Sequence, residues 1–252
     1  MYVVNLFKQL LHKFRKNEPE KTRTRLDFYK EKGILIGDRT YISPDANIDF
    51  TRPSLVTIGS DCYLNKGFTL LTHDFVTGVF RNVYKDFLNS SGKVVIGNNV
   101  HTGYNVIILK GVTIGDNSYI GANSLVTHSM PSNSIIAGAP AKVIYSIQEY
   151  YEKRLTECEK EAFEYARSIQ ERFNRTPKPE DFWEEFHLFV DASNITDYPM
   201  IPIEKQLGNN ENYVCWLKNH KAKYSGVDMF LKTALVDERM MLGLNECKMK
   251  CN

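Results

Sequence analysis

The sequence predicts a mainly β protein built around a parallel β-helix of about four coils. The first observation is a six-residue period, in which an aliphatic residue or threonine stands at Ile96, Thr102, Ile108, Ile114, Ile120 and Val126. The second is that the residue two positions before each next member is small or β-branched, at Val100, Val106, Val112, Ser118 and Ser124. Helices repeat every 3.6 residues and strands every two, so a period of six indicates the hexapeptide coils of a parallel β-helix.

Residues 1–33 are expected to form an N-terminal amphipathic helix and a lead-in to the repeat. The apolar side chains on one face of this helix would be Val3, Phe7, Leu10, Leu11 and Phe14. Basic residues occupy the other positions, as in helices that pack on a protein surface or associate weakly with an anionic membrane. Both roles stay open, with packing on the base of the column preferred.

Residues 34–145 contain the hexapeptide repeat. Three turns of six make one triangular coil, so the coils are expected at residues 36/42/48, 58/64/70, 96/102/108 and 114/120/126. Two insertions interrupt them, a short one containing Arg52 and Pro53 and a long protruding loop over residues 73–93. We expect inward aliphatic residues to stack from coil to coil, and the glycines after the repeat positions to supply corners with positive φ. Cys62 occupies a small-residue position of the repeat and is expected in the core.

Residues 146–252 are expected to form a mostly helical C-terminal extension. Ser146 and Glu149 have the spacing of a capping box, and apolar residues then recur at steps of three and four up to Phe173. A second, short helix is expected near Glu180. Its buried residues would be Phe182, Phe186 and Phe189.

The composition of the chain argues against several classes of function. The chain has 252 residues and a net charge of +2, which argues against bulk nucleic-acid binding. Its five cysteines are an odd number without a CxxC pair, as expected for free thiols in the cytoplasm. No long apolar run at the N-terminus suggests a signal peptide or a spanning helix.

His73 is the main candidate for chemistry, because it stands where the long loop leaves the column. Its imidazole could take a proton from a hydroxyl, with Asp74 orienting the ring. Alternatively, His73 only pins the loop by hydrogen bonding, and sequence leaves the two interpretations open. His101 and His128 could join His73 in a zinc site, but their phases place the three near different corners of one column. Zinc ligands drawn from two neighbouring chains stay open.

The run IGNNVHTGYNVIILKGVTIGDNSYIGANSLVTHSMPSNSIIAGAPAKVI, together with LLTHD, resembles the hexapeptide-repeat acyltransferases. The resemblance covers about residues 34–145 and is strongest to the branch of galactoside, maltose and capsular-polysaccharide O-acetyltransferases. It implies a left-handed β-helix, a homotrimer with active sites between two columns, acetyl-CoA as the acyl donor and no metal. It also implies that His73 is the general base and that a backbone N–H stabilises the tetrahedral oxyanion.

The resemblance further implies the residues that bind acetyl-CoA. The family's contacts match Gly103, Tyr104, Ala122, Thr127, His128 and Lys142. His128 stands where the family usually has lysine, which leaves a weaker and pH-dependent partner for the coenzyme phosphates. The alternative for Gly103 and Ala122 is that the coil corners require small residues in any case.

Contacts to the acceptor are expected from the loop and the nearby coils, at Asn65, Asp74, Arg81, Tyr84 and His101. Many relatives carry a tryptophan where this chain has His101, so their sugar specificity does not transfer. The expected function is O-acetylation of a sugar hydroxyl on a small molecule or oligosaccharide, namely a surface or capsular polysaccharide or its precursor. The alternatives are N-acetylation of an amino-sugar nucleotide, a zinc-dependent β-helix hydratase and a non-catalytic scaffold.

Overall fold

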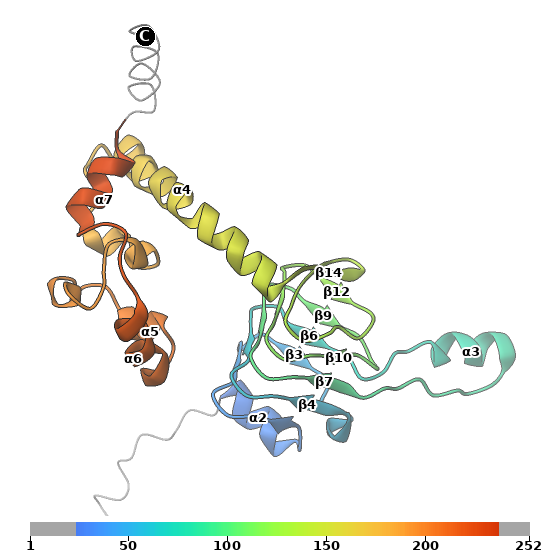
Figure 1. Cartoon of the computed structure of the whole chain (residues 1–252). Helices are drawn as coiled ribbons and strands as arrows, with labels where there is room; N and C mark the ends of the chain where they lie inside the picture. Colours follow the sequence, from blue (N-terminus) through green and yellow to red (C-terminus); the bar gives the residue numbers. More distant parts are fainter. Residues whose placement is uncertain (1–23, 237–252) are drawn as a thin grey trace, which may run out of the picture. The chain divides into compact units, whose positions relative to one another are not determined.

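The computed structural model describes residues 24–236, which divide into two compact units between Tyr150 and Tyr151 (Figure 1). The amphipathic helix expected within residues 1–16 lies outside the described residues. We call residues 24–150 the column unit and residues 151–236 the second unit.

Three sheets form the faces of the column unit, and all their strand pairs are parallel except the last pair of sheet B. Sheet A contains β1 (Leu35–Ile36), β4 (Val56–Ile58), β7 (Val94–Ile96) and β10 (Thr113–Ile114). Sheet B contains β2 (Tyr41–Ile42), β5 (Tyr63–Leu64), β8 (Val100–Thr102), β11 (Ser118–Ile120), β13 (Ser134–Gly138) and β14 (Ala141–Ser146). Sheet C contains β3 (Asn47–Ile48), β6 (Thr69–Leu70), β9 (Ile107–Ile108) and β12 (Leu125–Val126). Figure 1 shows β3, β6, β9 and β12 stacked one above the next, as in a parallel β-helix.

The strand register follows the six-residue phase of the sequence. In sheet A, Ile36 pairs with Ile58, Ile58 with Ile96, and Ile96 with Ile114. These side chains face inward because alternate residues of a strand point to opposite sides of the sheet. The core of the column therefore consists of stacked aliphatic layers, and Cys62 lies among them as expected, at 2% exposure.

The glycines that directly follow the repeat positions do not have positive φ angles, so the expectation is wrong for them. Asn99, Asn105, Asn117 and Asn123 do, with φ between 53° and 57°, as do two glycines in other turns of the column, Gly67 at 72° and Gly111 at 80°. The glycines are needed instead for close stacking of the coils: a Cβ at Gly103 would lie only 2.5 Å from the backbone N of Ala122. Asparagine tolerates the left-handed region because its short polar side chain can hydrogen-bond locally.

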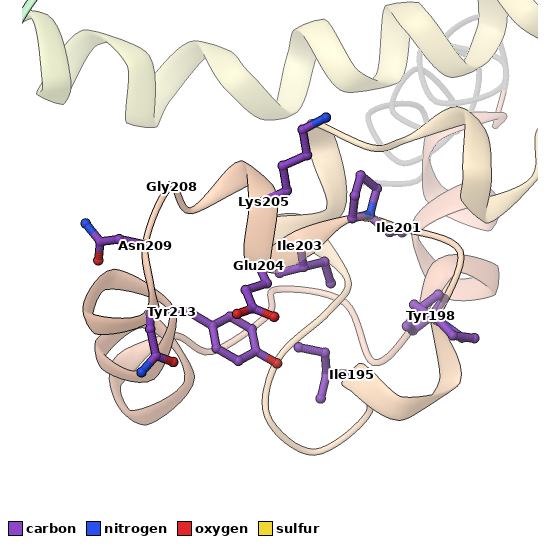
Figure 2. A pocket seen from close by; sticks show the side chains of 12 residues that line it. Ile195, Tyr198, Ile201, Ile203, Glu204, Lys205, Gly208, Asn209 and Tyr213 are labelled. Carbon is purple, nitrogen blue, oxygen red and sulfur yellow. The ribbon is translucent and has the colours of Figure 1, made fainter. Parts of the chain in front are cut away.

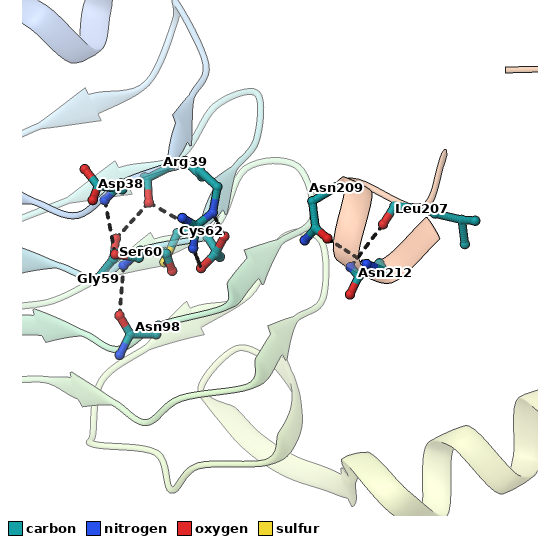
Figure 3. A network of polar contacts seen from close by, with 11 residues as sticks. Asp38, Arg39, Gly59, Ser60, Cys62, Asn98, Leu207, Asn209 and Asn212 are labelled. Atoms are coloured by element: carbon teal, nitrogen blue, oxygen red, sulfur yellow. Dashed lines mark hydrogen bonds and ion pairs between the residues drawn. The ribbon is translucent and has the colours of Figure 1, made fainter. Parts of the chain in front are cut away.

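Side-chain hydrogen bonds run from coil to coil along the corner between sheets A and B. Asn99 donates to Asn117 at 3.1 Å. Lower in the column the corner carries a bidentate ion pair between Arg39 and Asp61, with both N–O distances 2.6 Å. Figure 3 shows this end of the corner, where the Ser60 amide also donates to the Asn98 side chain at 2.9 Å. These bonds connect each coil to the next outside the sheets.

Helix α2 (Arg25–Glu31) closes the base of the column. Thr24 and Asp27 form a reciprocal capping box at its start. Tyr29 is fully buried, and its hydroxyl donates to the Ala46 carbonyl and accepts from the Ile48 amide, both at 2.9 Å. A capping element of this kind covers the apolar end that a solenoid would otherwise expose.

At the other end the repeat gives way to a hairpin, in which β13 and β14 pair antiparallel. Helix α4 (Ile147–Phe173) follows directly. The predicted capping box is present, because the Ser146 amide donates to the Glu149 carboxylate at 2.7 Å and the Glu149 amide donates to Ser146 Oγ at 3.2 Å.

The second unit packs short helices on the C-terminal half of α4. They are α5 (Ile203–Gln206), α6 (Asn210–Asn219), α7 (Val227–Ala234) and 3₁₀ helices at Pro179–Asp181, Glu185–Leu188 and Ile195–Asp197. The α-helix expected near Glu180 is replaced by the first two 3₁₀ turns. Its aromatic residues are nevertheless buried as predicted, and Phe182 packs edge-on against Phe230 at 5.2 Å between ring centroids. None of the helices in residues 24–236 combines the length and the apolarity that crossing a membrane requires.

Candidate functional site

His73 is held by a buried carboxylate from the coil below. It follows β6 where the chain leaves the column, and its Nδ1 lies 2.7 Å from Oδ2 of Asp49, which directly follows β3. The side chains are 19% and 5% exposed, respectively. Because an ionised carboxylate only accepts hydrogen bonds, His73 carries its proton on Nδ1 and presents the lone pair of Nε2.

Five hydrogen bonds converge on the Asp49 carboxylate. Besides His73, the backbone amide and the hydroxyl of Thr51 donate at 3.0 and 2.6 Å. The amide and the hydroxyl of Thr72 also donate, the amide at 3.3 Å. Burial acts to raise the pKa of Asp49, but these bonds outweigh burial and hold the pKa well below its ordinary value. Asp49 is therefore a fixed negative charge beside the imidazole.

The carboxylate that orients the ring is thus Asp49, and the expectation that Asp74 does so is wrong. Asp74 turns instead to Lys110 on the coil above, with which it forms an ion pair, and accepts from Ser90 Oγ at 2.9 Å. The hydrogen bond from Lys110 is the largest cause that lowers the pKa of Asp74 to about 2. Thr72 and His73 both turn to Asp49, whereas the next residue, Asp74, contacts Lys110 and Ser90 instead.

These contacts close the base of the long loop. The Gly92 amide donates to the Thr72 carbonyl at 2.9 Å, and His73 and Ser91 form an antiparallel bridge. The beginning and the end of the loop therefore meet at the column. Lys110 fastens the beginning to the next coil.

The tip of the loop carries α3 (Thr77–Tyr84), which Figure 1 shows held away from the coils. The predicted acceptor residues Arg81 and Tyr84 both lie on this helix and are exposed. No side chain of α3 is buried, and Phe75 just before it is 82% exposed. The tip thus presents apolar and basic side chains to its surroundings.

The predicted site residues fall on two corners of the column. His73, Thr127 and His128 all follow strands of sheet C, and His128 lies two coils above His73, about 10 Å at the usual strand spacing. The expectation that His73 and His128 occupy different corners is therefore wrong, whereas His101 does lie apart, on β8 of sheet B. The Nδ1 atom of His128 is 2.8 Å from Oγ1 of Thr127.

The other predicted contacts follow strands of sheet B. Asn65 follows β5, Gly103 and Tyr104 follow β8, and Ala122 follows β11. Gly103 is buried against Ala122, whereas Tyr104 is 56% exposed. Lys142 lies on β14 and is exposed. One chain therefore does not bring these residues together with His73, because they occupy another corner of the triangle.

His101 belongs to an aromatic row on the outer face of sheet B. Its ring stacks on Tyr63 at 6.1 Å, and Tyr63 stacks on Tyr41 at 4.5 Å. Burial lowers the pKa of His101, and the nearby Asp61 partly opposes that effect. Within residues 24–236, no three His, Cys, Asp or Glu side chains are grouped closely enough to hold a metal ion.

Two residues of the site were absent from the sequence prediction, Asp49 and Lys110. Each follows a strand of sheet C, one coil below and one coil above the point where His73 leaves. Counting the repeat phase past Ile48 and Ile108 places both residues at this corner, so the six-residue period alone is enough to predict their position.

Comparisons with known proteins agree with this architecture. A family model for the bacterial transferase hexapeptide (six repeats) matches residues 93–128. The chain is 32% identical over 160 residues to Galactoside O-acetyltransferase of Escherichia coli (strain K12), covering 56% of this chain and 78% of that protein. It is 36% identical over 158 residues to Protein CapG of Staphylococcus aureus, covering 59% and 91%. It is also 34% identical over 129 residues to Putative lipopolysaccharide biosynthesis O-acetyl transferase WbbJ of Escherichia coli (strain K12), covering 48% and 64%.

Proposed function

The chain belongs to the hexapeptide-repeat acetyltransferases, and from this premise we propose that it transfers an acetyl group from acetyl-CoA to a sugar hydroxyl. The proposed acceptor is a surface polysaccharide or its precursor, because the similar proteins include a galactoside O-acetyltransferase and a putative lipopolysaccharide O-acetyltransferase. The observation that carries the proposal is the Asp49–His73 pair at the base of the loop.

His73 acts as the general base in this proposal. Its Nε2 removes the proton of the sugar hydroxyl while the hydroxyl oxygen attacks the thioester carbonyl of acetyl-CoA. The buried carboxylate of Asp49 stabilises the imidazolium that forms. When the tetrahedral intermediate collapses, the carbon–sulfur bond breaks, and His73 returns the proton to the coenzyme sulfur. The products are the acetylated sugar and coenzyme A, and His73 is neutral again.

We propose that the acetyl-CoA site is shared between chains of a homotrimer of left-handed β-helices. The coenzyme would lie along Gly103, Tyr104 and Ala122 of one column and reach His73 of the next. The separation of these residues on two corners of one chain supports such a site, since a neighbouring column can bring the corners together. The phosphates would meet His128 and Lys142, and Thr127 positions the His128 ring through their hydrogen bond.

We place the reaction in the cytoplasm. The support is the state of the cysteines, because Cys62, Cys158 and Cys215 are free thiols. Free thiols of this kind are typical of reducing compartments.

The test is His73→Ala, assayed by mass spectrometry of a panel of oligosaccharides after incubation with acetyl-CoA. We expect the wild type to add an acetyl group to one class of sugar and the variant to lose about 100-fold or more of its turnover. Calorimetric titration with acetyl-CoA is the control, because removal of the base should leave donor binding intact. Undiminished turnover by the variant would show that His73 is not the base. N-acetylation of an amino sugar in the same panel would favour the alternative acceptor class.

A further inference from the structure

The second unit contains an open cavity that the proposed reaction does not use. Its volume is about 640 Å³, within the range of 300–1,000 Å³ that is usual for ligand sites. The wall residues come from the segment around Ile195, from the loop before α5, and from the loop that joins α5 to α6. The site is therefore built from pieces of chain that the fold of the second unit brings together.

The floor of the cavity is apolar and fixed. Ile201 and Ile203 are 5% and 4% exposed and belong to the core of the second unit. Tyr198 is also buried there, and its hydroxyl accepts from the Val227 amide at 3.0 Å. The cavity thus has a surface on which the C–H face of a ligand can rest.

Two polar side chains, Glu204 and Tyr213, line the cavity. Figure 2 shows both of them, and the Lys205 amine points away from them. Within residues 24–236, neither the Glu204 carboxylate nor the Tyr213 hydroxyl has a hydrogen-bond partner in the protein. Both groups are therefore available to a ligand.

The loop behind this wall is pre-organised. Asn209 caps α6 by accepting from the Asn212 amide at 2.8 Å, and the Asn212 side chain donates to the Leu207 carbonyl at 3.0 Å. The second bond ties the start of α6 to Leu207, the residue that follows α5; Glu204 lies on α5 and Tyr213 on α6. A fixed wall lowers the ordering cost of binding.

We propose that this cavity binds a neutral saccharide unit of the acceptor polymer. A carboxylate can accept from two neighbouring hydroxyls, a phenol can donate and accept, and an aromatic ring offers an apolar face to the sugar ring. Phosphorylated or carboxylated ligands would be repelled by Glu204, and a wholly apolar ligand would leave Glu204 and Tyr213 without partners. The chemistry of the wall therefore selects a neutral, polyhydroxylated ligand.

This inference rests on the proposed function, because a second saccharide site benefits an enzyme that acetylates a polymer. A chain held in the cavity stays at high effective concentration for the site at His73, without any new contact there. Polymers should therefore be better acceptors than short oligosaccharides, through a lower KM rather than a higher kcat.

The test compares Glu204→Gln and Tyr213→Ala with Glu211→Gln, which makes the same charge change on α6 outside the cavity lining. The full chain is titrated, without acetyl-CoA, onto an immobilised array of neutral and acidic oligosaccharides. We expect the wild type, His73→Ala and Glu211→Gln to bind neutral saccharides, and the two cavity variants to bind about tenfold more weakly, because each loses a hydrogen-bonding group. Binding of no saccharide, binding of acidic ones alone, or unchanged binding by both cavity variants would overturn the inference.

Turnover separates this inference from the proposed function. If a polymer is acetylated, Glu204→Gln should raise its KM about tenfold while kcat and short-acceptor kinetics stay unchanged. If no saccharide is acetylated, the proposed function fails, and the array alone still decides whether the cavity binds sugar.

Discussion

Replacing Asp49 by asparagine tests whether His73 needs the neighbouring carboxylate to act as the proposed general base. The substitution keeps the size of the side chain but places an amide beside Nδ1 of His73. An amide N–H donates to Nδ1, which moves the ring proton to Nε2 and removes the lone pair that should accept the sugar proton. The imidazolium of the transition state also loses its nearby negative charge.

The expected size of the effect follows from the geometry. Two unit charges 4 Å apart attract by about 4 kcal/mol at an effective dielectric constant of 20, and the Asp49–His73 contact is 2.7 Å between two largely buried side chains. Part of this attraction is offset, so we expect a loss of about 3 kcal/mol, or roughly 100-fold in kcat. The KM for acetyl-CoA should change little, because Asp49 faces the ring and not the donor.

The assay is steady-state acetyl transfer to the acceptor found in the panel. Asp45→Asn is the matched control, since Asp45 lies in the same coil and accepts from Ser43 Oγ at 2.5 Å and from the Gly67 amide at 3.2 Å. It should keep its kcat within about twofold, because it does not touch His73. Thermal unfolding shows whether either variant is misfolded. A well-folded Asp49→Asn enzyme with nearly normal kcat would refute the reasoning, as would a double variant with His73→Ala that is much worse than His73→Ala alone.

Three further perturbations probe the frame of the site. Lys110→Met removes the ion pair to Asp74, so kcat/KM for the acceptor should fall about tenfold. Lys110→Arg keeps the charge and should recover part of this loss. Wild-type kinetics in Lys110→Met would exclude a positioning role for Lys110. Gly103→Ala places a Cβ 2.5 Å from the backbone N of Ala122 and should lower the free energy of unfolding in urea by about 1–3 kcal/mol. An unchanged urea midpoint for Gly103→Ala would show that the coils can move apart at this position without loss of stability. Tyr29→Phe breaks both buried hydrogen bonds of its hydroxyl and should cost about 1–3 kcal/mol, read as a lower Tm; an equal Tm would show that water replaces the hydroxyl.

Much of the column could be predicted because one physical constraint repeats along it. Most inward positions are aliphatic and each stacked coil matches the one below, so the spacing of Ile36, Ile58, Ile96 and Ile114 predicts the register from the sequence. The same counting locates the insertions. It does not assign the corner conformations, because both glycine and asparagine tolerate positive φ, and the corners at residues 97–99, 103–105, 115–117 and 121–123 contain both.

The residues that fix the start of the loop, Asp49 beside His73 and Lys110 beside Asp74, were harder to predict, because they lie far away in sequence. Asp49 is 24 residues upstream and Lys110 is 37 downstream, and only the stacking of coils brings them to one corner. Asp74 is adjacent to His73 in sequence, but its carboxylate contacts Lys110 and Ser90 and not the imidazole. The cavity of the second unit had no repeat to reveal it, since its walls come from irregular loops.

The two ends of the long loop meet at the column, so changes at its tip need not disturb the stacked coils. Because the Thr72 carbonyl bonds the Gly92 amide, the segment between them begins and ends at one point of the coil. Loop-closure entropy grows slowly with length, by about 0.6 kcal/mol for each doubling, so residues 75–89 can be lengthened or rewritten at small cost. The length and sequence of this segment can therefore change while its base and the stacked coils stay the same.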